Sequence, residues 1–458
     1  MNVNSTDRTL QNRSETHGVL LGKQGNSWVW SGAQRSALIL GPTRSGKTTS
    51  IVIPNILCAT GPVVSTSTKP DVMDSTATAR SNSGTCLLFD PTNSLDDRPG
   101  VVRVGWSPLR LAATWDGAIA ISDSMVRASQ LRSQGAGSHD HWAERSSALL
   151  STLLFAAKAG DLDMKTVLSW TDRHQGSAAL EILEAIQGPV HPSTSLLDGI
   201  LATDAREQSG IWSTTSGVLG AYRSLNVLES TTTAALDSRS FLEEANTLYV
   251  CAPGSQQTLI APLVVGLVNE IQAEGYKRNQ NERPLLLALD ELANIAPLPD
   301  LPRLVSEGSG QGVLTIGCLQ DLSQARARWG SQAEGFLSLF STTVVMPGIA
   351  DITTLRTLRD LAGTTYKILP SESTSRSARG QRTESHSLNL SREPRLEIDI
   401  LTQGRRGEAL LLDASKRMGW IALSPSYRDQ PWRSLLSDRK LERSDASRSL
   451  EIPAPLVR

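Results

Sequence analysis

One short stretch constrains the fold more than any other: residues 41–48, GPTRSGKT, fit the phosphate-loop pattern G-x-x-x-x-G-K-[ST]. Ser36–Leu40 before it predicts a buried strand, and Thr48–Leu57 after it predicts a helix with one apolar face. Strand, loop and helix in this order present free backbone N–H groups and the positive end of a helix to bound phosphates. The sequence therefore predicts a nucleoside triphosphate site, and an ordinary glycine-rich turn is the weaker interpretation.

Each residue type in this loop has a predicted role. Lys47 is expected to reach the β- and γ-phosphate oxygens, the Thr48 hydroxyl is expected to bind Mg²⁺, and Thr49 is a candidate helper. The glycines let successive backbone N–H groups surround the β-phosphate. The residues predicted to bind the nucleotide are Gly41, Pro42, Thr43, Arg44, Ser45, Gly46, Lys47, Thr48 and Thr49.

A second acidic element lies far along the chain. Pro284–Leu289 is an apolar run that predicts a strand, and it ends in Asp290 and Glu291, which is a Walker B pattern. Asp290 is predicted to hold the Mg²⁺ shell, and Glu291 is predicted to polarise the water that attacks the γ-phosphate. A buried strand followed by two solvated acids is the alternative, and the phosphate loop upstream disfavours it.

A third predicted strand, Gly312–Leu319, ends in Gln320. At the carboxyl edge of a parallel sheet this amide would lie near the γ-phosphate and sense its hydrolysis. Its order after the Walker B strand favours that role, while an ordinary hydrogen bond at the edge of the sheet stays open.

Composition limits the class of protein. At 458 residues the chain is long enough for two or three domains, and its 39% hydrophobic content is ample for their cores. The formal net charge of −1 does not indicate nucleic acid, so any such contact must come from local patches. Four scattered cysteines predict reduced core residues and a cytoplasmic compartment. No apolar run approaches the ~18 residues of a membrane span, so action at a membrane would depend on partners.

The order of the predicted elements indicates a discontinuous α/β nucleotide-binding domain that an all-α domain interrupts, because strand patterns give way to a 3.6-residue period and later return. Pro370–Ser391, rich in Ser, Arg and Thr, is predicted to be an exposed loop, and nucleic-acid contact through its arginines is the weaker alternative. The predicted segments are a disordered N-terminus (1–16), the nucleotide-binding domain (17–106 and 241–431), the inserted domain (107–240) and a flexible tail (432–458). The predicted strands are Gly18–Leu21, Ser36–Leu40, Pro62–Ser65, Thr85–Phe89, Asn246–Ala252, Pro284–Leu289, Gly312–Leu319, Thr342–Met346 and Ala409–Leu412.

These motifs, in this order, resemble the TraG/TraD type of type IV secretion coupling proteins, which are conjugative DNA-transfer ATPases. The Asp-Glu-hydrophobic-x-Asn-Ile run followed by a Leu-Gln strand is the most specific part, because ATPases in general do not share it. The matching segments, spread over most of residues 18–430, are Gly41–Thr48, Val64–Asp71, Phe89–Pro91, Trp106–Leu109, Asp290–Ile295 and Leu319–Gln324.

The resemblance implies a RecA-like P-loop NTPase domain with a mostly parallel sheet and an inserted all-α domain, assembled as a ring hexamer with nucleotide sites between subunits. It implies a coupling ATPase that uses ATP and Mg²⁺ to drive DNA with its relaxase, or secreted proteins, toward type IV secretion channel components. The expected location is cytoplasmic, at the inner face of the cell membrane, held there by partners. Homologous proteins usually begin with transmembrane helices, which this sequence does not show.

A further departure concerns the arginine finger. Relatives often carry one between Walker B and the Gln strand, where this chain has Glu307–Gly312 without arginine. Such a guanidinium contributes roughly 10³ to 10⁵ in rate where it has been removed. The substitutes, by position alone, are Arg303, Arg326, Arg328 and Arg356.

Two other functions stay open at this stage. The chain could be a nucleotide-gated scaffold that docks substrates through residues 107–240 and hydrolyses little, which the missing finger favours. It could also be an FtsK-like DNA-pumping motor, which the long helical insertion disfavours. DNA binding in a ring lumen would weaken steeply with salt.

Overall fold

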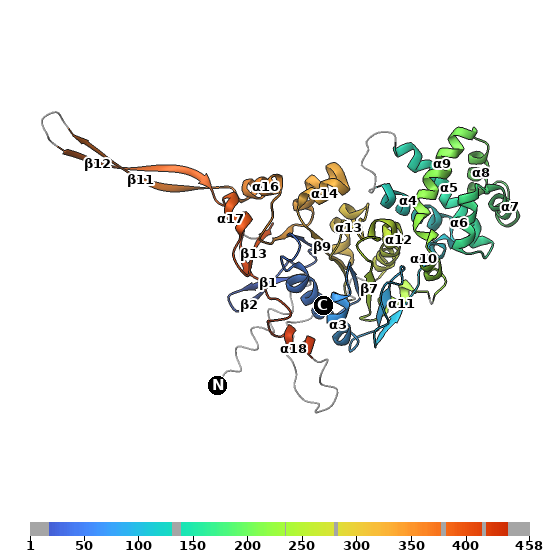
Figure 1. Ribbon diagram of the computed structural model, residues 1–458, viewed down its shortest axis with the longest axis horizontal. Helices are drawn as coiled ribbons and strands as arrows, with labels where there is room; N and C mark the ends of the chain where they lie inside the picture. Colours follow the sequence, from blue (N-terminus) through green and yellow to red (C-terminus); the bar gives the residue numbers. More distant parts are fainter. Residues whose placement is uncertain are drawn as a thin grey trace, which may run out of the picture.

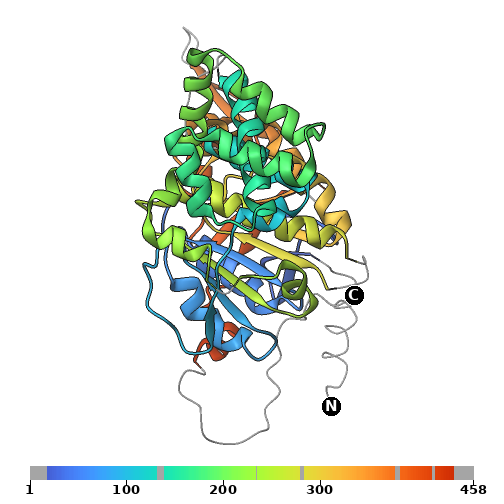
Figure 2. The same cartoon turned by 90° about the vertical axis from the view of Figure 1, so that its right-hand side faces the viewer.

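The computed structural model describes residues 18–130, 139–233, 235–278, 283–376, 382–414 and 418–437. Over these residues the core is one large sheet, with helices on both faces (Figures 1 and 2). In spatial order the strands are β2 (Ser27–Trp30), β1 (Leu20–Gln24), β14 (Gly419–Ala422), β13 (Glu408–Asp413), β10 (Thr342–Val345), β3 (Ala37–Leu40), β9 (Val313–Leu319), β8 (Leu285–Leu289), β4 (Val63–Ser67), β7 (Thr247–Cys251), β5 (Cys86–Phe89) and β6 (Val101–Arg103).

The sheet is mostly parallel. Every neighbouring pair from β10 to β6 in that order is parallel. The pairs from β2 to β10 are antiparallel and form one end of the sheet. This arrangement confirms the predicted fold class. Each predicted strand overlaps an observed one, whereas the sequence analysis missed the short strands β2, β6 and β14.

Alternation along the strands divides the core between the two faces. On β3, Leu38 and Leu40 pack on one face, while Ala37 and Ile39 pack on the other. This two-residue period is the pattern of a strand that is buried on both sides. The face that contains Ala37 is covered by η1 (Thr48–Val52), α2 (Ile53–Cys58), α3 (Asp71–Arg80) and α18 (Trp432–Ser437).

The opposite face carries the remaining helices of the nucleotide-binding part, together with the inserted helices. α12 (Gln257–Tyr276) has a long apolar central run and is buried along most of its length. The other helices on this side are α13 (Leu301–Gly308), η4 (Ser309–Gln311), α14 (Leu322–Trp329), η5 (Gly330–Gly335), α15 (Phe336–Leu339), α16 (Ile352–Ala362) and α17 (Ile398–Gln403).

A group of helices between β6 and β7, here called the helical block, lies at one end of the molecule (Figure 2). Its apolar interior is continuous with the sheet face that α12 covers. α4 packs on α12, and Gly266 of α12 leaves room for the Trp106 ring, which a Cβ would meet at 2.6 Å. The elements are η2 (Pro108–Ala113), α4 (Trp115–Gln130), α5 (His139–Ala159), α6 (Met164–Arg173), α7 (Gly176–Gln187), α8 (Pro192–Leu201), α9 (Ala205–Val218), η3 (Leu219–Arg223), α10 (Leu225–Ser230) and α11 (Ser238–Glu243).

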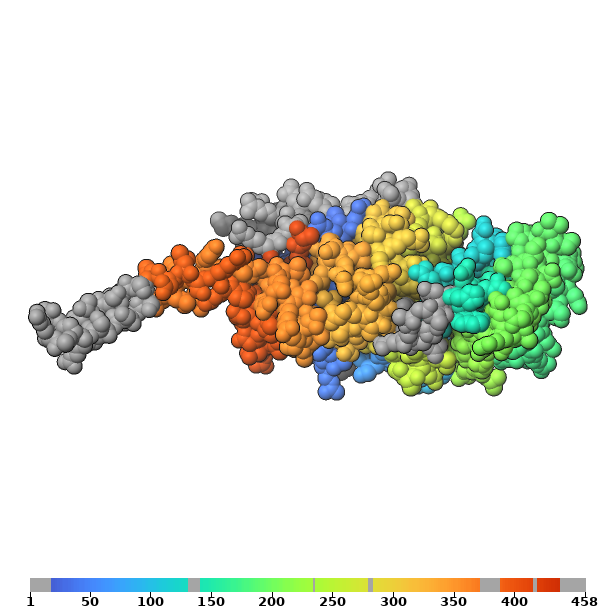
Figure 3. Space-filling view, turned by 90° about the horizontal axis from the view of Figure 1, so that it is seen from above, coloured from blue at the N-terminus to red at the C-terminus, as the bar shows by residue number. Residues whose placement is uncertain are grey.

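The predicted exposed loop at Pro370–Ser391 is wrong. Residues 364–376 and 382–394 form β11 (Thr364–Arg376) and β12 (Arg382–Pro394), an antiparallel pair that projects from the body (Figures 1 and 3). Ile368 pairs with Leu390, and the register continues to Arg376 opposite Arg382. The prediction gave most weight to the Ser, Arg and Thr content of this segment, and it overlooked the short alternation around Ile368 and Leu390, whose side chains are exposed and belong to no core. Residues 377–381, which include Arg379, lie outside the described residues.

The predicted tail also needs a correction at its first residues. Trp432 is fully buried and begins α18. Its ring lies 5.5 Å from the Trp28 ring, edge to face, and its Nε1 donates to Ser424 Oγ at 3.3 Å. The large apolar surface of Trp432 fixes the first residues of the predicted tail to the body of the protein, although the tail sequence is otherwise polar. Residues 1–16 and 438–458, which were predicted to be disordered or flexible, lie outside the described residues.

The boundary predicted between residues 240 and 241 falls inside α11, and the domain division as a whole stays a prediction. The four cysteines are free and buried, as the sequence predicts. Among the described residues, no helix has both the length and the apolar character that a membrane crossing requires.

Candidate nucleotide-binding site

The predicted site residues meet at the carboxyl edge of the parallel strands. β3 leads into the phosphate loop, β8 into Asp290 and Glu291, and β9 into Gln320. In the sheet β9 lies between β3 and β8, so the three strand ends are neighbours. Loops that follow parallel strands at this edge form the usual ligand crevice of such sheets. The sheet therefore brings together segments that are far apart in the chain.

The backbone of the phosphate loop makes a tight turn. Arg44 and Gly46 have positive φ angles of 63° and 96°. Gly41 lies so close to Met346, which follows the neighbouring strand β10, that a Cβ on residue 41 would meet Met346 Cβ at 2.6 Å. This close approach explains the need for glycine there. Lys47 Nζ donates to the carbonyl oxygens of Gly41 and Pro42, the second at 2.9 Å. The ammonium group is therefore folded over the loop.

The helix after the loop begins at Thr48 as the π-helical turn η1 and continues as α2. Its first N–H groups have no partner within the helix, so its N-terminus is suited to an anion. The buried Ser45 hydroxyl has no hydrogen-bond partner within the described part of the chain. An orphaned hydroxyl and a free helix N-terminus in one loop fit a bound phosphate group.

The remaining predicted contacts of the loop are less enclosed. Thr43 and Arg44 are exposed, and Pro42 is half-buried. Thr49 Oγ1 donates to Gly46 O at 3.4 Å, and Thr49 O accepts a bond of 2.8 Å from Ser426 N. Thr49 is thus held by structural contacts, and its role as a helper stays a prediction.

The Walker B acids are joined to the loop directly. Thr48 Oγ1 donates to Asp290 Oδ2 at 2.7 Å, although the two residues are 242 positions apart. Burial raises the pKa of Asp290, while the Thr48 bond and the Lys47 charge oppose that shift. Mg²⁺ prefers oxygen ligands such as hydroxyl and carboxylate groups, so Thr48 and Asp290 fit the cation that accompanies a nucleotide.

Glu291 lies beside Asp290 and is half-buried. Burial, followed by the charge of Asp290, raises the pKa of Glu291, and the Asn294 amide acts in the opposite direction. Asn294 Nδ2 donates to Glu291 Oε2 at 3.2 Å. The sequence analysis included Asn294 in a motif without giving it a role, and its three-residue spacing from Glu291 is the signal that could have found this contact.

Gln320 is at the predicted edge, and its side chain is exposed. Its backbone N–H donates to Gln324 Oε1 at 2.8 Å, which helps to turn the chain into α14. Its part in sensing the γ-phosphate stays a prediction.

Two of the candidate substitute arginines make contacts within their own chain. Arg326 Nη2 donates to Asp351 Oδ2 at 2.8 Å. Arg328 Nη2 donates to Asn294 Oδ1 at 3.5 Å. Arg303 and Arg356 are exposed on α13 and α16. A guanidinium already engaged in its own chain is a poor finger for a neighbouring site.

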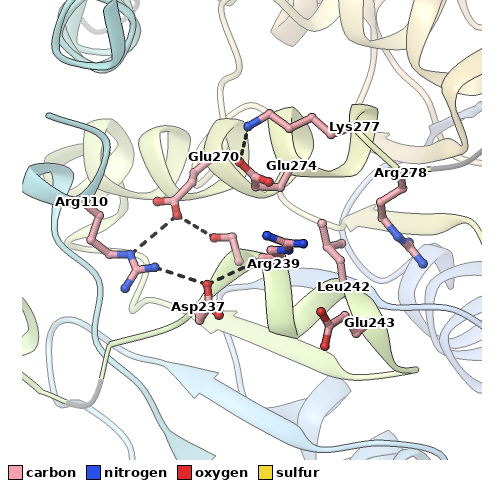
Figure 4. Close-up of a pocket in the computed structure, with 10 residues that line it drawn as sticks. Arg110, Asp237, Arg239, Leu242, Glu243, Glu270, Glu274, Lys277 and Arg278 are labelled. Carbon is pink, nitrogen blue, oxygen red and sulfur yellow. Dashed lines mark hydrogen bonds and ion pairs between the residues drawn. The ribbon is translucent and has the colours of Figure 1, made fainter. Parts of the chain in front are cut away.

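A hollow of about 860 Å³ lies elsewhere, between η2, α11 and the C-terminal half of α12 (Figure 4). Its buried carboxylate, Glu270, accepts from Trp106 Nε1 at 2.6 Å and from Ser238 Oγ at 2.8 Å. Arg110 pairs with both Glu270 and Asp237, as the dashed lines in Figure 4 show. These contacts fix the helical block to α12 and lie outside the phosphate site.

Comparisons with known proteins place this geometry in context. A family model described as Type IV secretory system Conjugative DNA transfer matches residues 2–397. Protein VirD4 of Rhizobium radiobacter is 36% identical over 91 residues, which cover 19% of this chain and 13% of that protein. Conjugal transfer protein TraG of Escherichia coli is 24% identical over 320 residues, 64% of this chain and 49% of that protein. The matches therefore span about half or less of the length of these curated relatives.

Solved structures share the fold. The conjugative coupling protein TrwBdeltaN70, in its unbound monoclinic form, superposes with a TM-score of 0.65 at 18% identity, covering 92% of each chain. TrwB in complex with ADP and Mg²⁺ gives a TM-score of 0.62 at 19% identity, covering 86% of this chain and 85% of that one. At this identity the similarity establishes the RecA-like fold alone.

Proposed function

This chain belongs to the Type IV secretory system Conjugative DNA transfer family, and from that premise we propose that it is a coupling ATPase, which hydrolyses ATP with Mg²⁺ to drive substrates toward a secretion channel. The observation that carries the proposal is the hydrogen bond between Thr48 and Asp290. It joins the phosphate loop to the Walker B acids at one sheet edge, at 2.7 Å.

Each proposed role follows from the side chain present. Lys47, flexible and cationic, would leave its carbonyl partners for the β- and γ-phosphate oxygens. Thr48 and Asp290 would hold Mg²⁺, which supplies positive charge against the phosphates. Glu291 would take a proton from the attacking water, and Gln320 would respond to the γ-phosphate from the end of β9.

The proposed partners come from the family and its relatives. The substrates would be DNA with its attached relaxase and secreted proteins, passed to type IV secretion channel components. The working form would be a homo-oligomer, a ring hexamer with sites between subunits, at the inner face of the cell membrane and held there by partners. TrwB structures with ADP and Mg²⁺, and with an ATP analogue, support nucleotide and Mg²⁺ binding in this fold.

A second candidate is a nucleotide-gated scaffold that docks substrates through the helical block and hydrolyses little. The intrachain bonds of Arg326 and Arg328 favour it, because they engage two arginines that might otherwise complete a neighbouring site. Slow hydrolysis is expected where no guanidinium reaches the γ-phosphate.

The deciding experiment measures ATP turnover of the purified protein with and without single- and double-stranded DNA. Lys47→Ala is expected to reduce turnover to background, because the loop loses the cation that meets the phosphates. DNA stimulation of a Lys47-dependent rate by several-fold supports the motor. Tight nucleotide binding with negligible turnover under every condition contradicts the motor and supports the scaffold.

A further inference from the structure

The loop after β8, residues 290–298, is tied to α14 at two points. Arg328 Nη2 donates to Asn294 Oδ1 at 3.5 Å, and the buried Trp329 Nε1 donates to Leu298 O at 2.8 Å. Both donors lie in the last turn of α14, whereas Gln320 precedes its N-cap, Asp321. One short helix therefore has Gln320 at its start and the Walker B loop against its end.

The amide of Asn294 joins this helix to Glu291. Its Nδ2 donates to Glu291 Oε2 at 3.2 Å, while its Oδ1 accepts from Arg328. A guanidinium carries donors alone, so it selects the oxygen end of an amide. The nitrogen end is then directed to Glu291, and the carboxylate oxygen that accepts this bond is fixed in direction.

From these contacts we infer that Asn294 is a positioning residue for Glu291, and that Arg328 acts through Asn294. The inference rests on the proposed hydrolysis for its kinetic consequence, but the contacts themselves are independent of it. Orientation matters because a base acts only within hydrogen-bond reach of the proton that it takes. Arg328 is thereby assigned a role within its own subunit, in place of a finger toward a neighbour.

The kinetic test compares Asn294→Ala, Asn294→Asp, Arg328→Met and Arg328→Lys in the full chain. Asn294→Ala is expected to lower kcat by about 10- to 100-fold, the loss typical when a residue that orients a metal ligand is removed, with nucleotide Kd unchanged. Asn294→Asp, although equal in size, is expected to lower kcat further, because it turns a carboxylate toward Glu291. Arg328→Lys keeps a donor, so it should retain more activity than Arg328→Met.

The double variant Asn294→Ala/Arg328→Met separates this role from a finger. If Arg328 acts through Asn294, the double variant is no slower than Asn294→Ala alone, because coupled residues are not additive. Multiplied losses, or a large loss in Arg328→Met with none in Asn294→Ala, overturn the inference. Asn389→Ala, on the exposed part of β12, is the matched control and is expected to leave kcat unchanged.

A spectroscopic readout keeps the inference separate from the proposed function. In protein labelled with [¹⁵N]asparagine, the Asn294 side-chain NH₂ signal is identified by its loss in Asn294→Asp. It is expected to move in both Glu291→Gln and Arg328→Met, and to stay in place in Asn389→Ala. Absence of turnover with these shifts present counts against the ATPase alone, whereas an unmoved signal overturns the positioning role whether or not ATP is hydrolysed.

Discussion

The amino and carboxyl edges of the central sheet both hold charged side chains, but the hydrogen-bond partners of these side chains differ. At the amino edge, Arg80 at the end of α3 is almost fully buried, and its guanidinium donates to Thr247 Oγ1 at 2.8 Å. The same group donates to the carbonyls of Ala59, Gly61 and Ala245, the last two at 2.9 and 2.8 Å. Its donors are thus distributed over the chain segments that lead into β4 and β7.

At the carboxyl edge, the neighbouring acids Asp290 and Glu291 are half-buried, and each accepts a side-chain hydrogen bond, from Thr48 Oγ1 and from Asn294 Nδ2. The pKa of each is raised, with burial as the largest cause. A buried charge that is surrounded by its hydrogen-bond partners stabilises a fold, whereas carboxyl groups with raised pKa values are suited to a ligand that supplies positive charge. The difference between the edges distinguishes a structural contact from a candidate binding site.

The largest expected effect comes at the carboxyl edge. Glu291→Gln keeps the shape and removes the base, so turnover is expected to fall by about 10²- to 10⁴-fold. Nucleotide affinity and the free energy of unfolding should change little, because the lost carboxylate was poorly solvated. Steady-state kinetics, titration of nucleotide binding and urea unfolding measure the three quantities. A variant that unfolds readily would show that Glu291 is a structural group after all.

The next effect is expected at the amino edge. Arg80→Met leaves several buried carbonyls without a donor, so the free energy of unfolding is expected to fall by about 3 kcal/mol. Urea unfolding followed by tryptophan fluorescence measures this change. Arg98→Met is the matched control, because Arg98 makes a partly exposed ion pair with Asp74 that contributes at most about 1 kcal/mol. Loss of nucleotide binding by a folded Arg80→Met variant would contradict the purely structural role of the amino edge.

The smallest effect is expected for Asn246, which also belongs to the amino edge. Its Oδ1 accepts from Thr85 N at 2.7 Å, and its Nδ2 donates to Phe241 O at 3.0 Å. Asn246→Ala should lower the free energy of unfolding by about 1 to 2 kcal/mol, because two backbone groups lose their partner. The nucleotide Kd should match that of the unaltered protein, and a shift in Kd would contradict the separation of the edges.

Sequence patterns predicted the parallel part of the sheet well. Buried strands such as β3 and β8 are short apolar runs, and their burial on both faces makes those runs continuous. The patterns failed where burial is weak or arises from distant packing. β11 and β12 lie exposed beyond the core, and Trp432 is buried by segments far away in the chain, among them Trp28 and α3.

The candidate site divides in the same way. The tight turn at residues 41–48 could be predicted because Gly41, Lys47 and Thr48 belong to one contiguous motif that depends on local backbone, and its binding of phosphate stays a prediction. The contact of Asn294 with Glu291 is nearly local, and its spacing was visible. The contact of Arg328 with Asn294 could not be predicted, because it depends on how α14 lies against the loop after β8, where Trp329 Nε1 also donates to Leu298 O.

The sequence by itself determined the parallel strands of the sheet, and it predicted that residues 41–48 bind phosphate and which residues carry charge there. Only the tertiary structure decided that Thr48 meets Asp290 across 242 positions. It also decided that Arg80 donates hydrogen bonds to backbone carbonyls at the opposite edge of the sheet. The physical reason is that backbone conformation and burial patterns act over a few residues, whereas a hydrogen bond between distant segments exists only once the sheet order has brought their strand ends together.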